Sequence, residues 1–195
     1  MPRIRYAVAM SLDGYIAGPK GEADWIIMDP DIDFGALFAQ FDTFLMGRRT
    51  FTALAGAGGP GMSGGKTFVF SRTLQPGDHP QVTIVPDVSP ETVAPIRALA
   101  RKDIWLFGGG VLFRSFLDAG LVDTVEVAVI PVLLGDGLPL LSQPAQQAKL
   151  KLTHHCVYKS GIVSLEYSVP ATESRGGNSS ALHSSSVPFP PTVAS

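Results

Sequence analysis

Three consecutive glycines interrupt the apolar segment WLFGGGVLFRSFL at residues 105–117. The pattern is typical of a buried strand that turns into a helix, with Gly108, Gly109 and Gly110 in the turn. Because glycine has no Cβ, a ligand can approach the backbone closely there, and the free N–H groups at a helix N-terminus bind phosphate. The spacing is not GxGxxG, so a tight turn without a ligand remains an alternative interpretation.

Arginines follow two further apolar segments. FLMGRRTF places Arg48 and Arg49 directly after a buried run, in the first turn of an expected helix, and FVFSRTL ends in Ser71 and Arg72. Cations at a helix N-terminus oppose the macrodipole, so a bound anion would explain the pair. The guanidinium fork matches phosphate oxygens, although a solvated pair of surface charges is the alternative.

The elements that must position these residues alternate between strand and helix. Helices are expected at residues 31–41, from residue 47 onward, at 90–101 and at 110–119. Strands are expected at residues 3–10, 43–46, 66–71, 82–85, 104–107, 124–134, 150–159 and 162–169. This order predicts an α/β fold with a mostly parallel mixed sheet of about eight strands that ends in an antiparallel hairpin.

The glycine and arginine segments all end strands of this expected sheet. In open α/β sheets, ligands bind at the carboxyl ends of the strands. Together the segments favour a dinucleotide whose pyrophosphate lies at the glycine turn and whose additional 2′-phosphate lies on the arginines. The sequence therefore predicts NADPH rather than NADH as the cofactor.

Composition limits the class of protein. Apolar residues make up 45% of the 195-residue chain and charged residues 16%, with a net charge of −2. A real core is expected, and no basic surface is available for nucleic acid or an acidic membrane. The single cysteine, Cys156, excludes an intrachain disulfide, and no metal site is assigned. The absence of a signal peptide or a spanning segment makes a cytoplasmic protein the expectation.

The domain organisation follows from a shift in composition. Residues 1–170 are expected to form one domain, and residues 171–195 a disordered tail rich in serine and proline. Low charge and a long apolar strand lead us to expect a homodimer that forms partly through residues 125–134 and the neighbouring strands.

The motifs, in order, resemble the dihydrofolate reductase-like family. They are VAMSLDGYIAG, MGRRTF, FSRTL, FGGGVLFRSFL and IPVLLGDG. The resemblance is strongest to the reductase (C-terminal) domain of the bifunctional deaminase–reductase of riboflavin biosynthesis, and it covers about residues 3–169. It implies a three-layer α/β/α fold, NADPH as the cofactor and a homodimer.

The resemblance also implies roles for individual residues. Ala9 and Ile16 would border the nicotinamide, and Ser71 and Arg72 would bind the 2′-phosphate. Phosphate contacts are implied for Gly47, Arg48, Arg49 and Thr50. Contacts to the pyrophosphate and the nicotinamide ribose are implied for Gly108, Gly109, Gly110 and Val111. The peptide bond between Gly108 and Gly109 is expected to be cis.

A proton donor is expected near the start of the first helix, because hydride transfer to a C=N carbon is assisted by proton supply. Asp29, Asp31 and Asp33 lie there, and Asp31 or Asp33 falls nearest to the position of the family's carboxylate. On a helix, Asp33 would share one face with Leu37 and Phe41. Each aspartate singly is also a common helix cap.

Three functions stay open. The first is an NADPH-dependent reductase of a small heterocycle, similar to 5-amino-6-(5-phosphoribosylamino)uracil reductase. The second is a dihydrofolate reductase, and the third is a non-catalytic module that binds NADP or senses a ligand. The physiological substrate is not fixed by these patterns.

Overall fold

The structure is a computed structural model that describes residues 1–56 and 64–170. The expected tail at residues 171–195 and part of the expected loop after the second helix lie outside the described residues.

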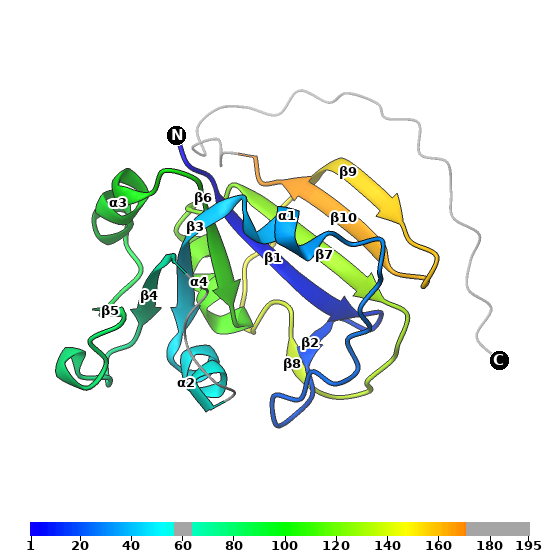
Figure 1. Cartoon of the computed structure of the whole chain (residues 1–195), viewed down its shortest axis with the longest axis horizontal. Helices are drawn as coiled ribbons and strands as arrows, with labels where there is room; N and C mark the ends of the chain where they lie inside the picture. Colours follow the sequence, from blue (N-terminus) through cyan, green and yellow to red (C-terminus); the bar gives the residue numbers. More distant parts are fainter. Residues whose placement is uncertain (57–63, 171–195) are drawn as a thin grey trace.

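One mixed sheet of eight strands organises the described part of the chain (Figure 1). Its order is β5-β4-β3-β6-β1-β7-β10-β9, parallel from β5 to β7 and antiparallel across β7, β10 and β9. The strands are β1 (Ile4–Ser11), β3 (Phe41–Gly47), β4 (Lys66–Phe70), β5 (Thr83–Val85), β6 (Asp103–Gly108), β7 (Thr124–Ile130), β9 (Lys151–Val157) and β10 (Val163–Ser168). The predicted fold class, with an antiparallel end, is confirmed.

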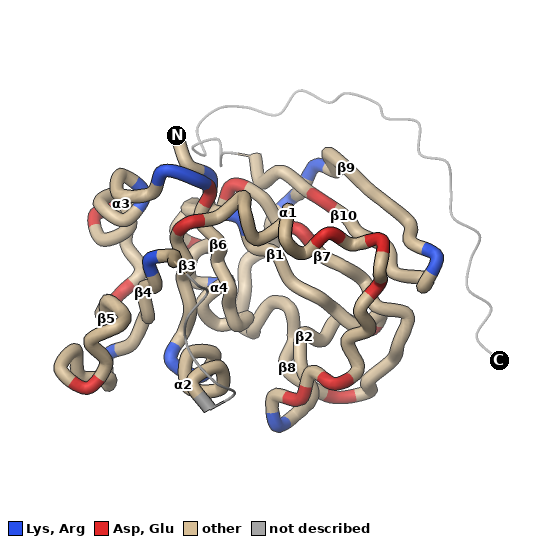
Figure 2. The backbone as a smooth tube through the Cα atoms, in the orientation of Figure 1, with Lys and Arg blue, Asp and Glu red and all other residues tan. Residues whose placement is uncertain are grey.

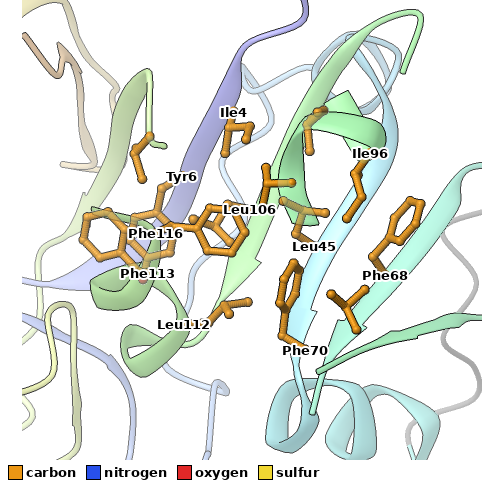
Figure 3. Packing of buried hydrophobic residues seen from close by; sticks show 14 of the residues in the cluster. Ile4, Tyr6, Leu45, Phe68, Phe70, Ile96, Leu106, Leu112, Phe113 and Phe116 are labelled. Carbon is orange, nitrogen blue, oxygen red and sulfur yellow. The ribbon is translucent and has the colours of Figure 1, made fainter. Parts of the chain in front are cut away.

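Helices cover both faces of the sheet, which makes three layers. Helices α3 (Pro90–Leu99) and α4 (Gly110–Asp118) pack on one face, where Tyr6 stacks on Phe113 with ring centroids 3.8 Å apart (Figure 3). Helices α1 (Phe34–Phe38) and α2 (Arg48–Gly56) lie on the other face, over a smaller cluster around Trp105. Apolar burial on both faces stabilises the sheet.

The first helix is much shorter than predicted. Residues 31–41 were expected to be helical, but α1 begins after Asp33, whose carboxylate accepts a hydrogen bond from the backbone N–H of Ala36. The carbonyl of Gln40 instead accepts a hydrogen bond from Asp103, and Phe41 begins β3. Phe41 is buried against Trp105, so packing on the sheet prevails over helical periodicity there. The expected face of Asp33, Leu37 and Phe41 does not form.

The strand expected at residues 124–134 ends at Ile130 because Pro131 cannot donate a ladder hydrogen bond. A small second sheet, which the sequence pattern did not indicate, pairs β2 (Tyr15–Ala17) with β8 (Leu138–Pro139). Strand β7 lies between β1 and β10 and offers no free edge for the expected homodimer contact. Among the described strands, β9 ends the sheet on that side.

Within residues 1–56 and 64–170, no helix has the length and apolar character that spanning a membrane requires. The same residues contain no group of three or more His, Cys, Asp and Glu side chains that could hold a metal ion. His154 and His155 pair with Glu166 and Leu165 on β10, so they occupy opposite faces of β9.

Candidate active site

The glycine turn joins the end of β6 to the start of α4. Gly108 has φ +103°, a conformation that side chains rarely adopt, so the backbone itself requires glycine there. The Gly108–Gly109 peptide bond is cis, as the resemblance implied. A Cβ on Gly47, at the end of β3, would lie 3.6 Å from the carbonyl oxygen of Gly108. Two of the expected phosphate segments therefore meet at the carboxyl edge of the sheet.

Gly109 lies close to two more of the expected cofactor residues. A Cβ built on it would lie 3.8 Å from Cδ1 of Ile16 and 3.9 Å from Oγ1 of Thr50. These are ordinary van der Waals distances, so a methyl group on Gly109 would fit in contact with both side chains. The fold thus brings β2, α2 and the glycine turn to one place.

Gly110 is required for a different reason from the one that the sequence suggested. A Cβ there would lie 2.5 Å from the carbonyl oxygen of Pro139 and 3.0 Å from that of Leu140. The close neighbour of Gly110 is therefore the backbone around β8, not space for a ligand. Val111 is exposed in the first turn of α4.

The arginines at this edge are exposed cations. Within the described chain, the side chains of Arg48, Arg49 and Arg72 form no hydrogen bond or ion pair. Figure 2 shows basic residues at the start of α2. Such cations have hydrogen-bond donors free for an anion.

The hydroxyl of Ser71 holds its own turn. It accepts hydrogen bonds from the backbone N–H groups of Thr73 and Leu74, at 3.2 and 3.1 Å. This turn sets the position of the chain at Arg72, which follows the end of β4. The Ser71 hydroxyl lies 3.3 Å from that of Thr73, and either can be the donor.

A pocket of about 370 Å³ lies on the α1 face of the sheet. Its walls come from β1, β7 and β10, from α1 and from the segment before α1. Ala9 lines it, and the following β2 carries Ile16 to the glycine turn. The expected nicotinamide neighbours therefore connect this pocket to the glycine turn.

The three candidate aspartates have different surroundings. Asp33 lines the pocket, and its Oδ1 accepts the Ala36 N–H at 2.8 Å. Asp33 and Asp31 are both exposed, but the carboxylate of Asp31 lies 3.9 Å from Nζ of Lys159 and does not line the pocket. The structure therefore separates the two residues that the sequence could not distinguish.

Asp29 joins two segments that are distant in the sequence. Its carboxylate accepts hydrogen bonds from the backbone N–H groups of Asp31 at 2.8 Å and of Ser160 at 3.2 Å. Hydrogen bonds lower the pKa of Asp29, and the largest contribution comes from Ser160 and the next from Asp31. Its position indicates that it fixes the segment before α1 to the β9–β10 turn.

Asp13, in the motif SLDG, also holds a loop. It accepts a 2.6 Å hydrogen bond from the Ser11 hydroxyl and further bonds from the backbone N–H groups of Leu134 and Gly135. Hydrogen bonds also lower the pKa of Asp13, and the largest contribution comes from Ser11 and the next from Gly135. These contacts connect SLDG to IPVLLGDG, two of the motifs on which the resemblance rests.

Sequence reasoning missed a buried ion pair at the pocket. Glu126 lines the pocket from β7, and its two oxygens accept hydrogen bonds from Nε and Nη2 of Arg5, both at 2.7 Å. Burial works to lower the pKa of Arg5, but hydrogen bonds and charge from Glu126 and Asp103 raise it above its usual value. The sequence did contain a signal for this ion pair. Two apolar strands each carry one charged residue, Arg5 and Glu126, and charges buried in a core are almost always paired with an opposite charge.

Comparisons with known proteins agree with this geometry. The family described as RibD C-terminal domain matches residues 2–164. The chain belongs to that family. It is 37% identical over 178 residues to the uncharacterized protein YyaP of Bacillus subtilis strain 168, which covers 85% of this chain and 94% of YyaP.

Two solved structures extend the comparison of this RibD C-terminal domain. A protein from Shewanella sp. PV-4, named provisionally for riboflavin biosynthesis, superposes with a TM-score of 0.74 and 26% identity, covering 87% of this chain and 99% of that one. Dihydrofolate reductase from Enterococcus faecalis superposes with a TM-score of 0.62 and 16% identity, covering 86% and 96%. The latter likeness confirms the dihydrofolate reductase-like fold.

Proposed function

We propose that this protein is an NADPH-dependent reductase of a small heterocyclic substrate. The observation that carries the proposal is the adjacency of two sites. Ala9 lines the pocket, and Ile16, a few residues further along the chain, lies beside Gly109 and Thr50. A cofactor seated on the glycine turn would reach a substrate in the pocket over the end of β1. Membership in the RibD C-terminal domain family supports this reading.

The residues at the sheet edge fit NADPH. Arg48, Arg49 and Arg72 have no partners among the described residues and can bind phosphate. Because Gly109 has no side chain, the cofactor could approach the backbone closely at this turn. The E. faecalis dihydrofolate reductase, which shares the fold, is a complex with NADP(H).

When bound, NADPH supplies the hydride, and the pocket supplies position and a proton. The apolar walls of the pocket would contact the substrate ring. Asp33 can exchange a proton with the substrate at Oδ2, because Oδ1 accepts the Ala36 N–H and Oδ2 has no hydrogen-bond partner among the described residues. This role falls to Asp33 rather than Asp31, whose side chain lies outside the pocket.

Cofactor binding and turnover test this proposal separately. NADPH fluorescence is titrated against the protein, and NADPH oxidation is then measured with pterins, dihydrofolate and ribosylaminopyrimidines. We expect saturable NADPH binding and oxidation with at least one compound. Failure to bind NADPH would refute the proposal, and binding without oxidation of any compound would favour a non-catalytic module.

A matched pair of variants tests the proton donor. Asp33→Asn should lower kcat by roughly 10²-fold or more with little change in NADPH affinity. Asp24→Asn, at an exposed position in the segment before α1, removes the same charge away from the pocket and should leave kcat unchanged. Equal rates for the two variants would remove Asp33 from the mechanism.

We also propose that the protein is a homodimer. Leu152 and Val157 on β9 are 48% and 69% exposed, which gives this outer strand an apolar surface that a second copy could cover. Sedimentation should show a dimer, and Leu152→Lys should dissociate it. A monomer at every concentration tested would refute the assembly.

A further inference from the structure

The pocket beside α1 is lined by acids and, among the described residues, by no cation. Its charged lining consists of Asp33 and Glu126, and no lysine, arginine or histidine of the described chain lines it. Outside the described ranges, the sequence contains one arginine, Arg175, and one histidine, His183. This lining contrasts with the sheet edge, where Arg48 and Arg49 lie.

Two cations, Arg5 and Lys159, neighbour residues that line the pocket without lining it themselves. Arg5, beneath the pocket, donates to Glu126 through two nitrogens and through Nη1 to Gln40 at 2.7 Å and to Asp103 at 3.3 Å. Lys159 is 92% exposed and lies 3.9 Å from the Asp31 carboxylate. Arg5 is therefore neutralised beneath the pocket, and Lys159 extends into solvent and does not line the pocket.

The two carboxylates of the lining offer acceptor positions only, whereas the hydroxyls of Tyr158 and Ser164 can donate or accept. Glu126 Oε1 accepts hydrogen bonds from Arg5 and Thr124, whereas Oε2 accepts one, from Arg5. A carboxylate oxygen can accept two hydrogen bonds, so Oε2 retains an acceptor position. Asp33 Oδ2 has no hydrogen-bond partner among the described residues. A ligand that satisfies both carboxylates must carry N–H or O–H donors.

The remaining lining suits a flat ring. Ala9 on β1 and Ala128 on β7 are direct neighbours in register, so small side chains form the floor between the two strands. Phe38 and Trp105, with ring centroids 5.2 Å apart, provide an aromatic wall. Planar heterocycles stack on such surfaces.

We propose that the pocket selects a planar heterocycle that is neutral or cationic, carries N–H donors and has no phosphate. The inference rests on the proposed reductase function and deepens it. Arg5 neutralises Glu126, so a phosphate dianion held in the pocket would lose its hydration next to the Asp33 carboxylate, and no cation of the described chain lines the pocket to compensate it. Bound NADPH would contact the arginines at the sheet edge, whereas the carboxylates of the pocket would determine which substrate binds.

A matched pair of ligands tests this selectivity. 5-Amino-6-(ribosylamino)uracil and its 5′-phosphate are compared by calorimetry and by KM, each with the whole protein and with or without saturating NADPH. We expect the unphosphorylated compound to bind at least roughly tenfold more tightly. Equal or tighter binding of the phosphate would overturn the inference while leaving the reductase proposal in place. Failure to bind NADPH would refute only the reductase proposal, because ligand preference is also measured without the cofactor.

A pair of lysine variants on β10 makes the test independent of substrate choice. Ser164 lines the pocket, and Ser168 lies four residues further on the same face of the strand but outside the lining. Ser164→Lys should shift the preference roughly tenfold toward the phosphate, whereas Ser168→Lys, which adds the same charge, should not. An unchanged preference in Ser164→Lys, or the same shift in both variants, would overturn the inference.

Discussion

Arginines lie both at the sheet edge and beneath the pocket, but their surroundings are opposite. Arg48, Arg49 and Arg72 are exposed and lack partners among the described residues. Arg5 is 6% exposed and donates to Glu126, Gln40 and Asp103. An exposed cation stays solvated until a ligand arrives, whereas a buried one must be neutralised when the chain folds. The arginines at the sheet edge are therefore available for binding a ligand, whereas Arg5 is part of the folded core.

The largest expected effect comes from breaking the buried pair. Glu126→Ala leaves Arg5 with Asp103 as its remaining carboxylate partner, at 3.3 Å, so the free energy of unfolding should fall by about 3–5 kcal/mol. Arg48→Ala removes an exposed charge, and its effect should stay within about 0.5 kcal/mol. Urea unfolding of both variants measures the contrast. Similar losses in the two would show that burial does not distinguish the two regions.

The second contrast lies within the glycine turn. Gly110→Ala places a Cβ 2.5 Å from the Pro139 carbonyl oxygen, so the variant should be destabilised by about 1–3 kcal/mol. Gly109→Ala meets atoms at 3.8 Å or beyond and should retain the fold while it loses NADPH affinity by roughly tenfold, about 1.4 kcal/mol. Thermal unfolding and NADPH titration are measured for each. A Gly109→Ala protein with unchanged NADPH affinity would leave the arginines as the main cofactor contact.

The success of sequence reasoning differed between these two regions for a physical reason. Local patterns were enough to predict the elements of the sheet edge, since the strand, the glycine turn and the helix are consecutive in the chain. The capping of α3 by Ser89, with Pro90 in its first turn, was predicted in the same way. The cis bond at Gly108 was implied by the family resemblance.

The pocket could not be predicted as well, because it is assembled from distant segments. Arg5 and Glu126 are 121 residues apart, and their contact depends on strand order. The first helix was predicted too long because its apolar period continues into Phe41, which packs on the sheet instead. The distinction between Asp31 and Asp33 depends on where α1 begins, the least certain feature of a sequence-based prediction.

The arginines at the sheet edge should make the protein discriminate between NADPH and NADH. NADPH should bind more than roughly tenfold more tightly than NADH, a difference of about 1.4 kcal/mol or more. Arg72→Ala should reduce this preference by weakening NADPH binding and leaving NADH binding unchanged. Fluorescence titration with both cofactors measures this preference, with Lys66→Ala, an exposed position at the start of β4, as the control. Equal dissociation constants in the unmodified protein would contradict the assignment of these residues to a 2′-phosphate.

The smallest expected effect is on acid stability, and it tests whether a carboxylate outside the pocket serves the fold alone. Hydrogen bonds from Ser160 and Asp31 lower the pKa of Asp29 below its unfolded value of about 3.9, so folding favours the ionised form. The stabilisation from Asp29 should therefore be fully present above that pH and be lost as the pH falls through the lower folded value. Asp29→Asn should be less stable than the unmodified protein at neutral pH, and the two unfolding curves should converge in acid, while Asp24→Asn keeps the original slope. A difference that stayed constant across this pH range would mean that the amide in the Asp29→Asn variant disturbs packing and that the charge of Asp29 contributes nothing.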